Sequence, residues 1–206
     1  QPELFKKENN NKFIKAELIN FRRRKEANRR SNEKNNRFNK ENYLLDQKAK
    51  AFTNGSVFKN MIPGASCPLE KMPKCVVVDD SYEWEGDKPL SIPLNKTIIY
   101  EMHVKGFSKL FPKIEDAHRG KFKALSSPKL INYLKWLGIT AVELQPIHSY
   151  FGNKTGNERV NYWGYETLSF FAPDNSYLIG ARTDDFKDMV KALHKNNLEV
   201  ILDVVY

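Results

Sequence analysis

The sequence contains little cysteine and no long apolar run, and both absences exclude classes of protein. Its two cysteines, Cys67 and Cys75, lack the spacing of metal ligands and have no histidine near them. Disulfide frameworks normally use more cysteines in a shorter chain, so we expect reduced thiols and a cytoplasmic protein. No apolar segment approaches the ~18 residues that span a bilayer, and the opening residues show no secretory signal. We therefore expect no membrane partner.

Positive charge is concentrated in the first third of the chain. The formal net charge is +9, from 34 Lys and Arg against 25 Asp and Glu. Residues 1–75 hold 18 of the basic and 8 of the acidic residues, which leaves a nearly neutral 16 and 17 for residues 76–206. Residues 1–36 contain too few apolar side chains to offset the entropy cost of ordering. We predict that residues 1–36 form a basic, low-complexity, disordered arm.

The arginine cluster in this arm, residues 22–24, could also indicate a segment that binds nucleic acid. No stacking aromatic residues are interleaved with the cluster, so nucleic acid is the less favoured partner. Residues 37–96 follow with scattered turn signals such as Asn54-Gly55 and Pro63-Gly64. We predict that residues 37–96 form an extended connector that lies over a neighbouring domain.

From residue 97 onward the pattern changes to alternating strands and helices. The strand segments are rich in β-branched and aliphatic residues, and the helix segments have apolar residues at helical spacing. The first helix has Ser127 as N-cap, Pro128 at its first position and Gly138 beyond its end. Strands joined by helices predict a parallel sheet with both faces covered. The predicted strands are residues 97–104, 139–144 and 198–205, and the predicted helices are residues 128–137 and about 184–196, the second capped by Thr183.

Several motifs from residue 97 onward resemble, in order, the bacterial glycogen debranching enzymes and isoamylases of the α-amylase superfamily. Residues 99–107 are similar to the first barrel strand of these enzymes and residues 140–148 to the second. Residues 161–165 resemble the loop after that strand, and residues 203–206 open the first conserved region of the family. The likeness runs from about residue 37 to the end. The motifs are Tyr100-Glu101-Met102-His103-Val104, Val142-Glu143-Leu144-Gln145-Pro146, Asn161-Tyr162-Trp163-Gly164-Tyr165 and Asp203-Val204-Val205-Tyr206.

The resemblance implies an α/β fold in which residues 97–206 are the first three strands of a (β/α)₈ TIM barrel. It also implies a glycoside hydrolase that cleaves α-1,6-glucosidic branch linkages of glycogen or another branched α-glucan by a retaining mechanism, without a cofactor or metal. Family members carry their nucleophile and acid/base on later strands, beyond Tyr206. The arm at residues 1–36 does not resemble the β-sandwich module that precedes the barrel in relatives. We therefore expect an N-terminal fragment that is inactive on its own.

Three residues are candidates for substrate binding. Tyr165 matches the family position whose ring stacks on the sugar beside the cleaved bond, and Trp163 is a candidate for the same wall of the site. Asp203 ends an apolar strand, where an unpaired carboxylate would be costly to bury, and matches the family aspartate that organises this subsite. Without the resemblance, the aromatic residues of this loop would be interpreted as core packing, which is the commoner role of buried rings.

Other polar residues in the strands have structural interpretations. Glu101 and Glu143 lie within strands and are expected to support the site indirectly or to form inter-strand hydrogen bonds. His103 and His148 are expected to be packed, because no cluster of residues has metal-ligand spacing. His194 is expected to be exposed.

Two other functions remain open. The chain could be a non-catalytic product of a split or decayed gene, or a remnant that only binds glycans. It could also come from a branching or trehalose-forming relative, since these enzymes share the barrel.

Overall fold

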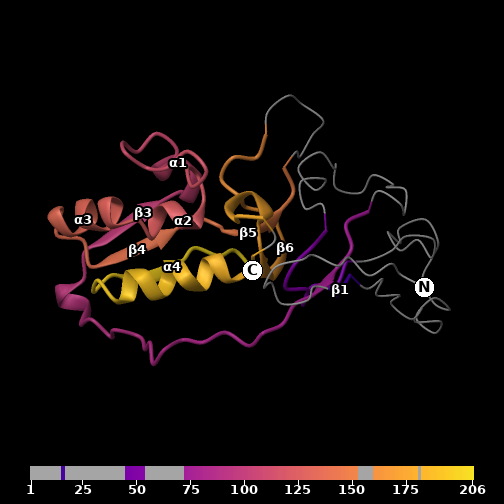
Figure 1. The fold of residues 1–206 in the computed structure, drawn as a ribbon, viewed down its shortest axis with the longest axis horizontal. Helices are drawn as coiled ribbons and strands as arrows, with labels where there is room; N and C mark the ends of the chain where they lie inside the picture. The colour runs from indigo at the N-terminus through magenta and orange to yellow at the C-terminus, as the bar shows by residue number, and fades with distance from the viewer. Residues whose placement is uncertain (1–14, 17–44, 54–71, 153–159, 181) are drawn as a thin grey trace, which may run out of the picture.

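The computed structural model describes residues 15–16, 45–53, 72–152, 160–180 and 182–206 (Figure 1). Nearly all of the predicted arm, residues 1–36, lies outside these ranges, as does much of the predicted connector. Within the arm, β1 (Lys15–Ala16) is described, and it pairs antiparallel with β2 (Val76–Val77). Of the helices in the described ranges, none has the length and apolar composition needed to cross a membrane.

Three parallel strands form the central sheet. They are β3 (Ile99–Met102), β4 (Ala141–Leu144) and β7 (Glu199–Leu202), with β4 in the middle. Their aliphatic and β-branched residues favour extended backbone, and each parallel pair is joined by a crossover that contains helices. The predicted parallel sheet with connecting helices is confirmed.

The first strand is shorter than predicted because a helix begins inside residues 97–104. His103 Nδ1 accepts a hydrogen bond from Gly106 N–H (3.0 Å), and this side chain caps α1 (Val104–Ser108). A side-chain acceptor at this position satisfies one of the free N–H groups of the first helical turn. The chain then passes through α2 (Phe122–Leu125), which packs against α1.

The next helix, α3 (Pro128–Trp136), follows its sequence signals closely. Ser127 Oγ accepts a hydrogen bond from Leu130 N–H (3.4 Å), and Pro128 occupies the first turn. Gly138 follows the helix with a φ of +79°, a left-handed conformation that favours glycine. The predicted start and stop of this helix are confirmed.

The last helix, α4 (Asp184–His194), has a different beginning from the one predicted. Thr183 has helical backbone angles and makes no side-chain capping bond, so the predicted cap is wrong. The buried carboxylate of Asp185 instead accepts a hydrogen bond from Ile179 N–H (2.6 Å). Burial raises the pKa of Asp185, while its bond to Ile179 N–H opposes that shift. The helix start is therefore tied to the preceding loop.

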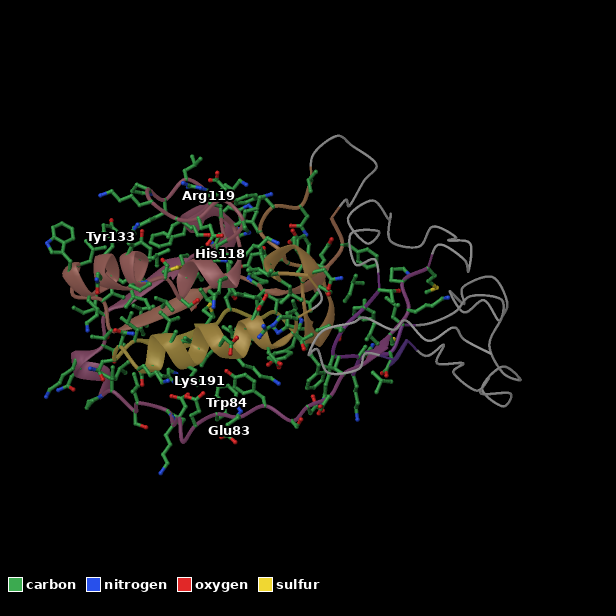
Figure 2. All side chains as sticks on the ribbon, viewed as in Figure 1. Glu83, Trp84, His118, Arg119, Tyr133 and Lys191 are labelled. Atoms are coloured by element: carbon green, nitrogen blue, oxygen red, sulfur yellow. The ribbon has the colours of Figure 1, made fainter. Side chains whose placement is uncertain are left out.

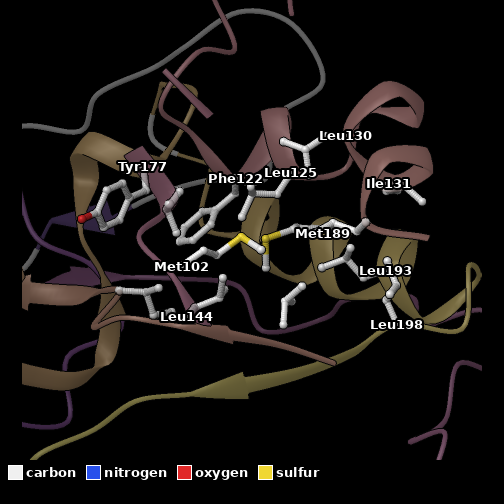
Figure 3. Packing of buried hydrophobic residues seen from close by; sticks show 14 of the residues in the cluster. Met102, Phe122, Leu125, Leu130, Ile131, Leu144, Tyr177, Met189, Leu193 and Leu198 are labelled. Atoms are coloured by element: carbon white, nitrogen blue, oxygen red, sulfur yellow. The ribbon is translucent and has the colours of Figure 1, made fainter. Parts of the chain in front are cut away.

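The helices pack on one face of the sheet and enclose the core (Figure 3). Alternate strand residues point to that face, because side chains alternate along a strand. Met102, Val142 and Leu144 are at most 4% exposed. They pack with apolar residues of the helices and the connecting loops, which include Phe122, Leu125, Leu130, Ile131, Leu134, Tyr177, Met189, Leu193 and Leu198.

The opposite face of the sheet has a different character. Glu101, Glu143 and Ile201 are in register on the three strands and belong to this second face. Ile99 and Ile201 are exposed there, although both are large apolar residues. The prediction of a sheet with both faces covered therefore does not hold within the described residues, where helices pack on one face and Ile99 and Ile201 are exposed on the other.

Residues 79–92, which we call the strap, run as an extended segment beside α4 (Figures 1 and 2). Tyr82 OH donates a hydrogen bond to Asp188 Oδ1 (2.7 Å). Farther along α4, His194 Nδ1 donates to Asp87 Oδ2 (2.8 Å), and both side chains are only 13% exposed. The prediction that His194 is exposed is wrong, because the strap covers it.

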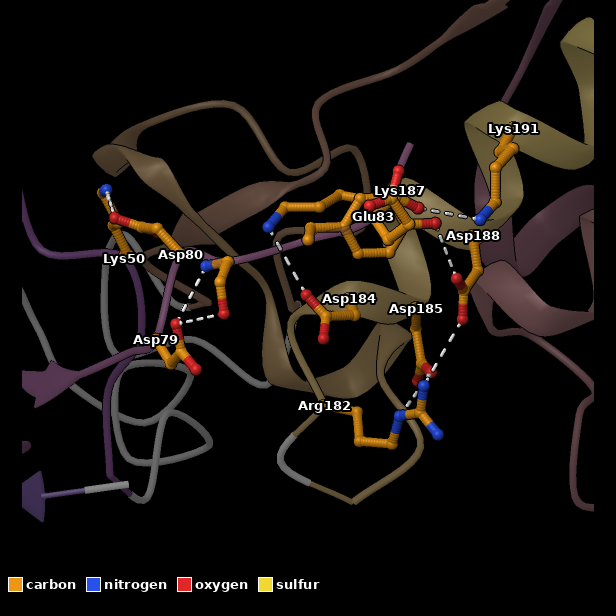
Figure 4. A network of polar contacts seen from close by, with 12 residues as sticks. Lys50, Asp79, Asp80, Glu83, Arg182, Asp184, Asp185, Lys187, Asp188 and Lys191 are labelled. Atoms are coloured by element: carbon orange, nitrogen blue, oxygen red, sulfur yellow. Dashed lines mark hydrogen bonds and ion pairs between the residues drawn. The ribbon is translucent and has the colours of Figure 1, made fainter. Parts of the chain in front are cut away.

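Charged side chains reinforce the contact between the strap and α4 (Figure 4). Lys191 Nζ donates to the carbonyl oxygen of Glu83 (3.1 Å) and to Glu85 Oε1 (2.8 Å). Lys187 Nζ and Lys191 Nζ each lie 5.0 Å from the ring centroid of Tyr82, within range of a cation–π interaction. Most of these groups are partly exposed, so each ion pair contributes little alone, and the strap is held by their combination.

Candidate active site

The carboxyl ends of the three parallel strands bring the candidate residues together. Beyond β4, Gln145 N–H donates to Met102 O (3.0 Å), and beyond β7, Asp203 N–H donates to Leu144 O (2.9 Å). These bonds continue the sheet past the strands and fix Asp203 beside the end of β4. Tyr165 OH donates a hydrogen bond to Asp203 Oδ2. Two of the three predicted site residues, 38 positions apart in sequence, are therefore in direct contact.

Tyr165 is presented by the segment that connects two antiparallel strands, β5 (His148–Tyr150) and β6 (Thr167–Pro173). Asn161 organises this segment from within. Its Nδ2 donates to Phe151 O (3.0 Å) and to Tyr165 O (2.6 Å). Asn161 was not among the predicted site residues, and its only sequence signal is its place at the start of the aromatic motif.

Gly164 allows the loop to approach the end of β4. Asn161 Oδ1 accepts a hydrogen bond from Gly164 N–H (3.2 Å), and the glycine has a φ of +86°. A Cβ atom at this position would lie 2.8 Å from the carbonyl oxygen of Pro146. Both the backbone angle and the close contact therefore require glycine immediately before Tyr165.

Tyr162 anchors the same loop against the end of β3. Its ring stacks on His103, with centroids 4.3 Å apart, and its carbonyl oxygen accepts a hydrogen bond from His103 Nε2 (2.8 Å). Because His103 Nδ1 accepts from Gly106 N–H, Nε2 carries the proton. A side chain on Gly106 would overlap the Tyr162 hydroxyl. His103 is buried, as predicted, and it links α1 to the aromatic loop.

The third predicted residue, Trp163, lies in the same loop, two positions before Tyr165. Its side chain is 56% exposed, and within the described residues no hydrogen bond or ring contact joins it to Tyr165 or Asp203. More than half of this residue is therefore accessible to solvent. Its role in substrate binding stays a prediction.

Negative charge surrounds the Tyr165 hydroxyl. The pKa of Tyr165 is raised to about 12, first by its hydrogen bond to Asp203, then by burial and by the charges of Asp203, Glu101 and Glu143. Each of these carboxylates disfavours a phenolate nearby. Tyr165 consequently remains a neutral hydrogen-bond donor throughout the physiological pH range.

Glu101 and Glu143 lie side by side on β3 and β4, below the Tyr165–Asp203 pair. Gln145 Nε2 donates to Glu101 Oε1 (2.9 Å), which is the predicted kind of inter-strand hydrogen bond. Gln145 is a second residue that sequence reasoning missed. Within the described ranges, no group of three or more His, Cys, Asp or Glu side chains is arranged to hold a metal ion.

The arrangement suits recognition of a sugar. An aromatic ring offers an apolar face for the C–H groups of a pyranose, and nearby carboxylates and amides can accept or donate hydrogen bonds to its hydroxyls. Asp203 fixes the orientation of the Tyr165 ring through the phenol.

Known proteins resemble this chain along most of its length. The family described as "Alpha amylase, catalytic domain" matches residues 107–206. The glycogen debranching enzyme of Serratia proteamaculans is 45% identical over 184 residues, which cover 82% of this chain and 28% of that protein.

Solved structures of pullulanases share the fold. The Bacillus acidopullulyticus pullulanase matches with a TM-score of 0.60 at 25% identity, over 79% of this chain and 20% of its own. The type I pullulanase of Bacillus subtilis, solved with maltose, matches with a TM-score of 0.56 at 32% identity, over 77% of this chain and 22% of its own. The chain thus spans between a fifth and three tenths of these relatives.

Proposed function

The chain is a debranching-type member of the α-amylase family, and we propose that it forms part of an enzyme that hydrolyses α-1,6-glucosidic branch linkages in glycogen or another branched α-glucan. In this proposal β3, β4 and β7 are the first three strands of a (β/α)₈ barrel. Active sites of such barrels lie at the carboxyl ends of the strands. Tyr165 and Asp203 meet at that end of the sheet.

The contact between Tyr165 and Asp203 is the single observation that supports this proposal best. If Tyr165 only packed in the core, its hydroxyl would not need a carboxylate as partner. Asp203 could then accept hydrogen bonds from other donors. Their contact instead holds the ring at a fixed angle beside polar groups, as a sugar-stacking residue needs. We propose that Tyr165 stacks on the sugar next to the cleaved bond, that Asp203 orients it and binds hydroxyls, and that Trp163 extends the aromatic surface.

The proposed reaction is retaining and needs two further carboxylates. In retaining enzymes one carboxylate attacks the sugar and another protonates the leaving oxygen, at a separation of roughly 5–5.5 Å. We assign neither role within residues 1–206. The residues of this chain are proposed to bind and orient the glucan, and the 206-residue chain alone is expected to be inactive.

The test uses the intact enzyme, by which we mean the complete protein that carries this sequence. Reducing ends released from pullulan and glycogen report α-1,6 hydrolysis, and chromatography of the products reports chain length. Tyr165→Ala and Asp203→Ala should each lower kcat/KM by about 100-fold, the usual scale for misplacing a substrate at its reacting centre. Tyr133→Phe on α3 is the control, because it removes a partly exposed hydroxyl and keeps the ring that contacts Phe107 and Phe111, and it should leave activity unchanged.

The products distinguish the proposal from its alternatives. A branching relative transfers chains without a net release of reducing ends, and a trehalose-forming relative alters the reducing end itself. A glycan-binding remnant binds glycogen without releasing product. Any of these results, or full activity in both site variants, would contradict the proposed debranching function.

A further inference from the structure

The paired glutamates of β3 and β4 are not explained by the binding role given to Tyr165 and Asp203. Glu101 and Glu143 are in register on adjacent parallel strands and lie on the face of the sheet away from the helices. Strands in a sheet are about 5 Å apart, so the two side chains are immediate neighbours. Like charges placed directly opposite each other destabilise a sheet. Stability alone therefore does not explain why both strands carry a glutamate at this position.

No cation compensates the pair within the part of the chain that the structure describes. Gln145 donates its amide to Glu101 (2.9 Å), and this neutral group leaves the charge in place. The other ionisable groups on this face are Glu199, one layer toward the amino ends of the strands, and Asp203 and Tyr165 at the carboxyl ends. No described lysine or arginine forms an ion pair with Glu101 or Glu143. The ionisable groups that the structure describes on this face therefore include no positive charge.

The charges of Glu101 and Glu143 also act on Tyr165. Tyr165 is held mainly by Asp203, yet both glutamates also disfavour ionisation of its phenol. A negative potential therefore extends from the middle of the sheet to the carboxyl ends of the strands, where the sugar is proposed to bind. In the complete barrel proposed above this face would line the interior, where screening is weaker and such charges act over several ångströms.

We propose that Glu101 and Glu143 set the electrostatic potential of the sugar site, a role that rests on the proposed glycosidase function. The transition state of glycoside hydrolysis carries positive charge on the sugar ring. Fixed negative charge nearby stabilises that state more than the neutral ground state, which raises kcat. The same charge favours the protonated form of the acid/base carboxyl, so that the acid stays active to higher pH.

The test replaces each carboxylate by its amide in the intact enzyme. Glu101→Gln and Glu143→Gln remove one charge each and keep the shape and hydrogen-bonding capacity of the side chain. Each should lower kcat by about tenfold with little change in KM, the scale expected for one unit charge several ångströms away at an effective dielectric constant of about 20. The high-pH limb of kcat/KM should move to lower pH by about one unit.

Two controls separate this role from a structural one. Glu143→Asp keeps the charge and should retain the high-pH limb of the parent enzyme. Glu199→Gln removes a carboxylate from the same face but one layer farther from Tyr165, and should leave the limb in place. Thermal unfolding of both amide variants should match the parent or exceed it, because a like-charge contact is relieved.

The outcomes are distinct. Amide variants with an unchanged pH profile and unchanged kcat would overturn the electrostatic role while leaving the debranching function intact. A lower melting temperature without a shift of the limb would show that the pair is structural, and would also overturn it. A parent enzyme without hydrolytic activity would refute the proposed function itself, and this inference with it.

Discussion

Removal of the Tyr82 hydroxyl is expected to weaken the attachment of the strap to α4. Tyr82 OH donates to Asp188 Oδ1 at 2.7 Å, in a partly buried contact. Burial and this bond, in that order, raise the pKa of Tyr82 to about 12. Hydrogen bonds to charged groups contribute about 1.5–3 kcal/mol. Asp188 keeps a second partner, Arg182 (3.4 Å), so we expect Tyr82→Phe to cost about 1–2 kcal/mol, near the lower end of that range.

Unfolding of the chain in urea measures this cost. Trp84 lies 4.8 Å from Tyr82, ring centroid to centroid, so its fluorescence reports the strap once Trp136 and Trp163 are replaced by Phe. Asp188→Asn and the double variant complete a cycle, whose coupling energy isolates the bond from other effects of each substitution. Tyr133→Phe is the matched control: Tyr133 is partly exposed and its hydroxyl has no hydrogen-bond partner in the described residues.

We expect Tyr82→Phe to lower the free energy of unfolding. The double variant should lose only slightly more than Tyr82→Phe, and Tyr133→Phe should lose nothing. Coupling near zero, with each single variant destabilised, would mean that the two residues act independently. A cost in Tyr133→Phe equal to that of Tyr82→Phe would mean that the measurement senses the loss of any hydroxyl. Either result would refute the reasoning from the 2.7 Å contact.

Three further predictions follow from the site and its surroundings. Gly164→Ala should destabilise the aromatic loop by about 1–3 kcal/mol in thermal unfolding, because of its left-handed backbone and the contact with Pro146 O. Gly138→Ala, where no atom lies within 4 Å of the added Cβ, should cost less in the same experiment. Burial lowers the pKa of His148, so at low pH the unfolded chain binds a proton that the folded chain excludes. The free energy of unfolding should therefore fall as the pH decreases below about 6.5, and it should fall less steeply in His148→Asn. Urea midpoints measured across pH 5–8 test this. The 206-residue chain should release no reducing ends from glycogen above a buffer blank, and release that is abolished by Tyr165→Ala would contradict this.

The sequence predicted the regular elements well where local signals agree with packing. Ser127, Pro128 and Gly138 mark the ends of α3 as the structure has them. Thr183 failed as a cap because the buried Asp185 fixes the start of α4 through a loop residue instead. The early end of β3 depended on His103, whose ring caps α1. Both differences arise from side chains that bond to nearby backbone, which apolar periodicity does not reveal.

Contacts between distant segments could not be predicted from local pattern. The bond from Tyr82 to Asp188 joins positions 106 apart, and the bond from His194 to Asp87 joins positions 107 apart. Nothing in the sequence of the strap indicates which helix it covers. Likewise, Tyr165 and Asp203 were chosen separately by resemblance, and only the fold shows that they touch.

The two faces of the sheet explain why the function was less visible in the sequence than the fold. On the face toward the helices, Met102, Val142 and Leu144 follow the apolar alternation that a buried strand requires. On the other face the same strands carry Glu101 and Glu143, which weaken the strand signal. A local departure from the folding pattern is expected where a residue serves a site. The glutamates are thus better evidence of function than the apolar residues beside them, because stability alone does not account for their presence.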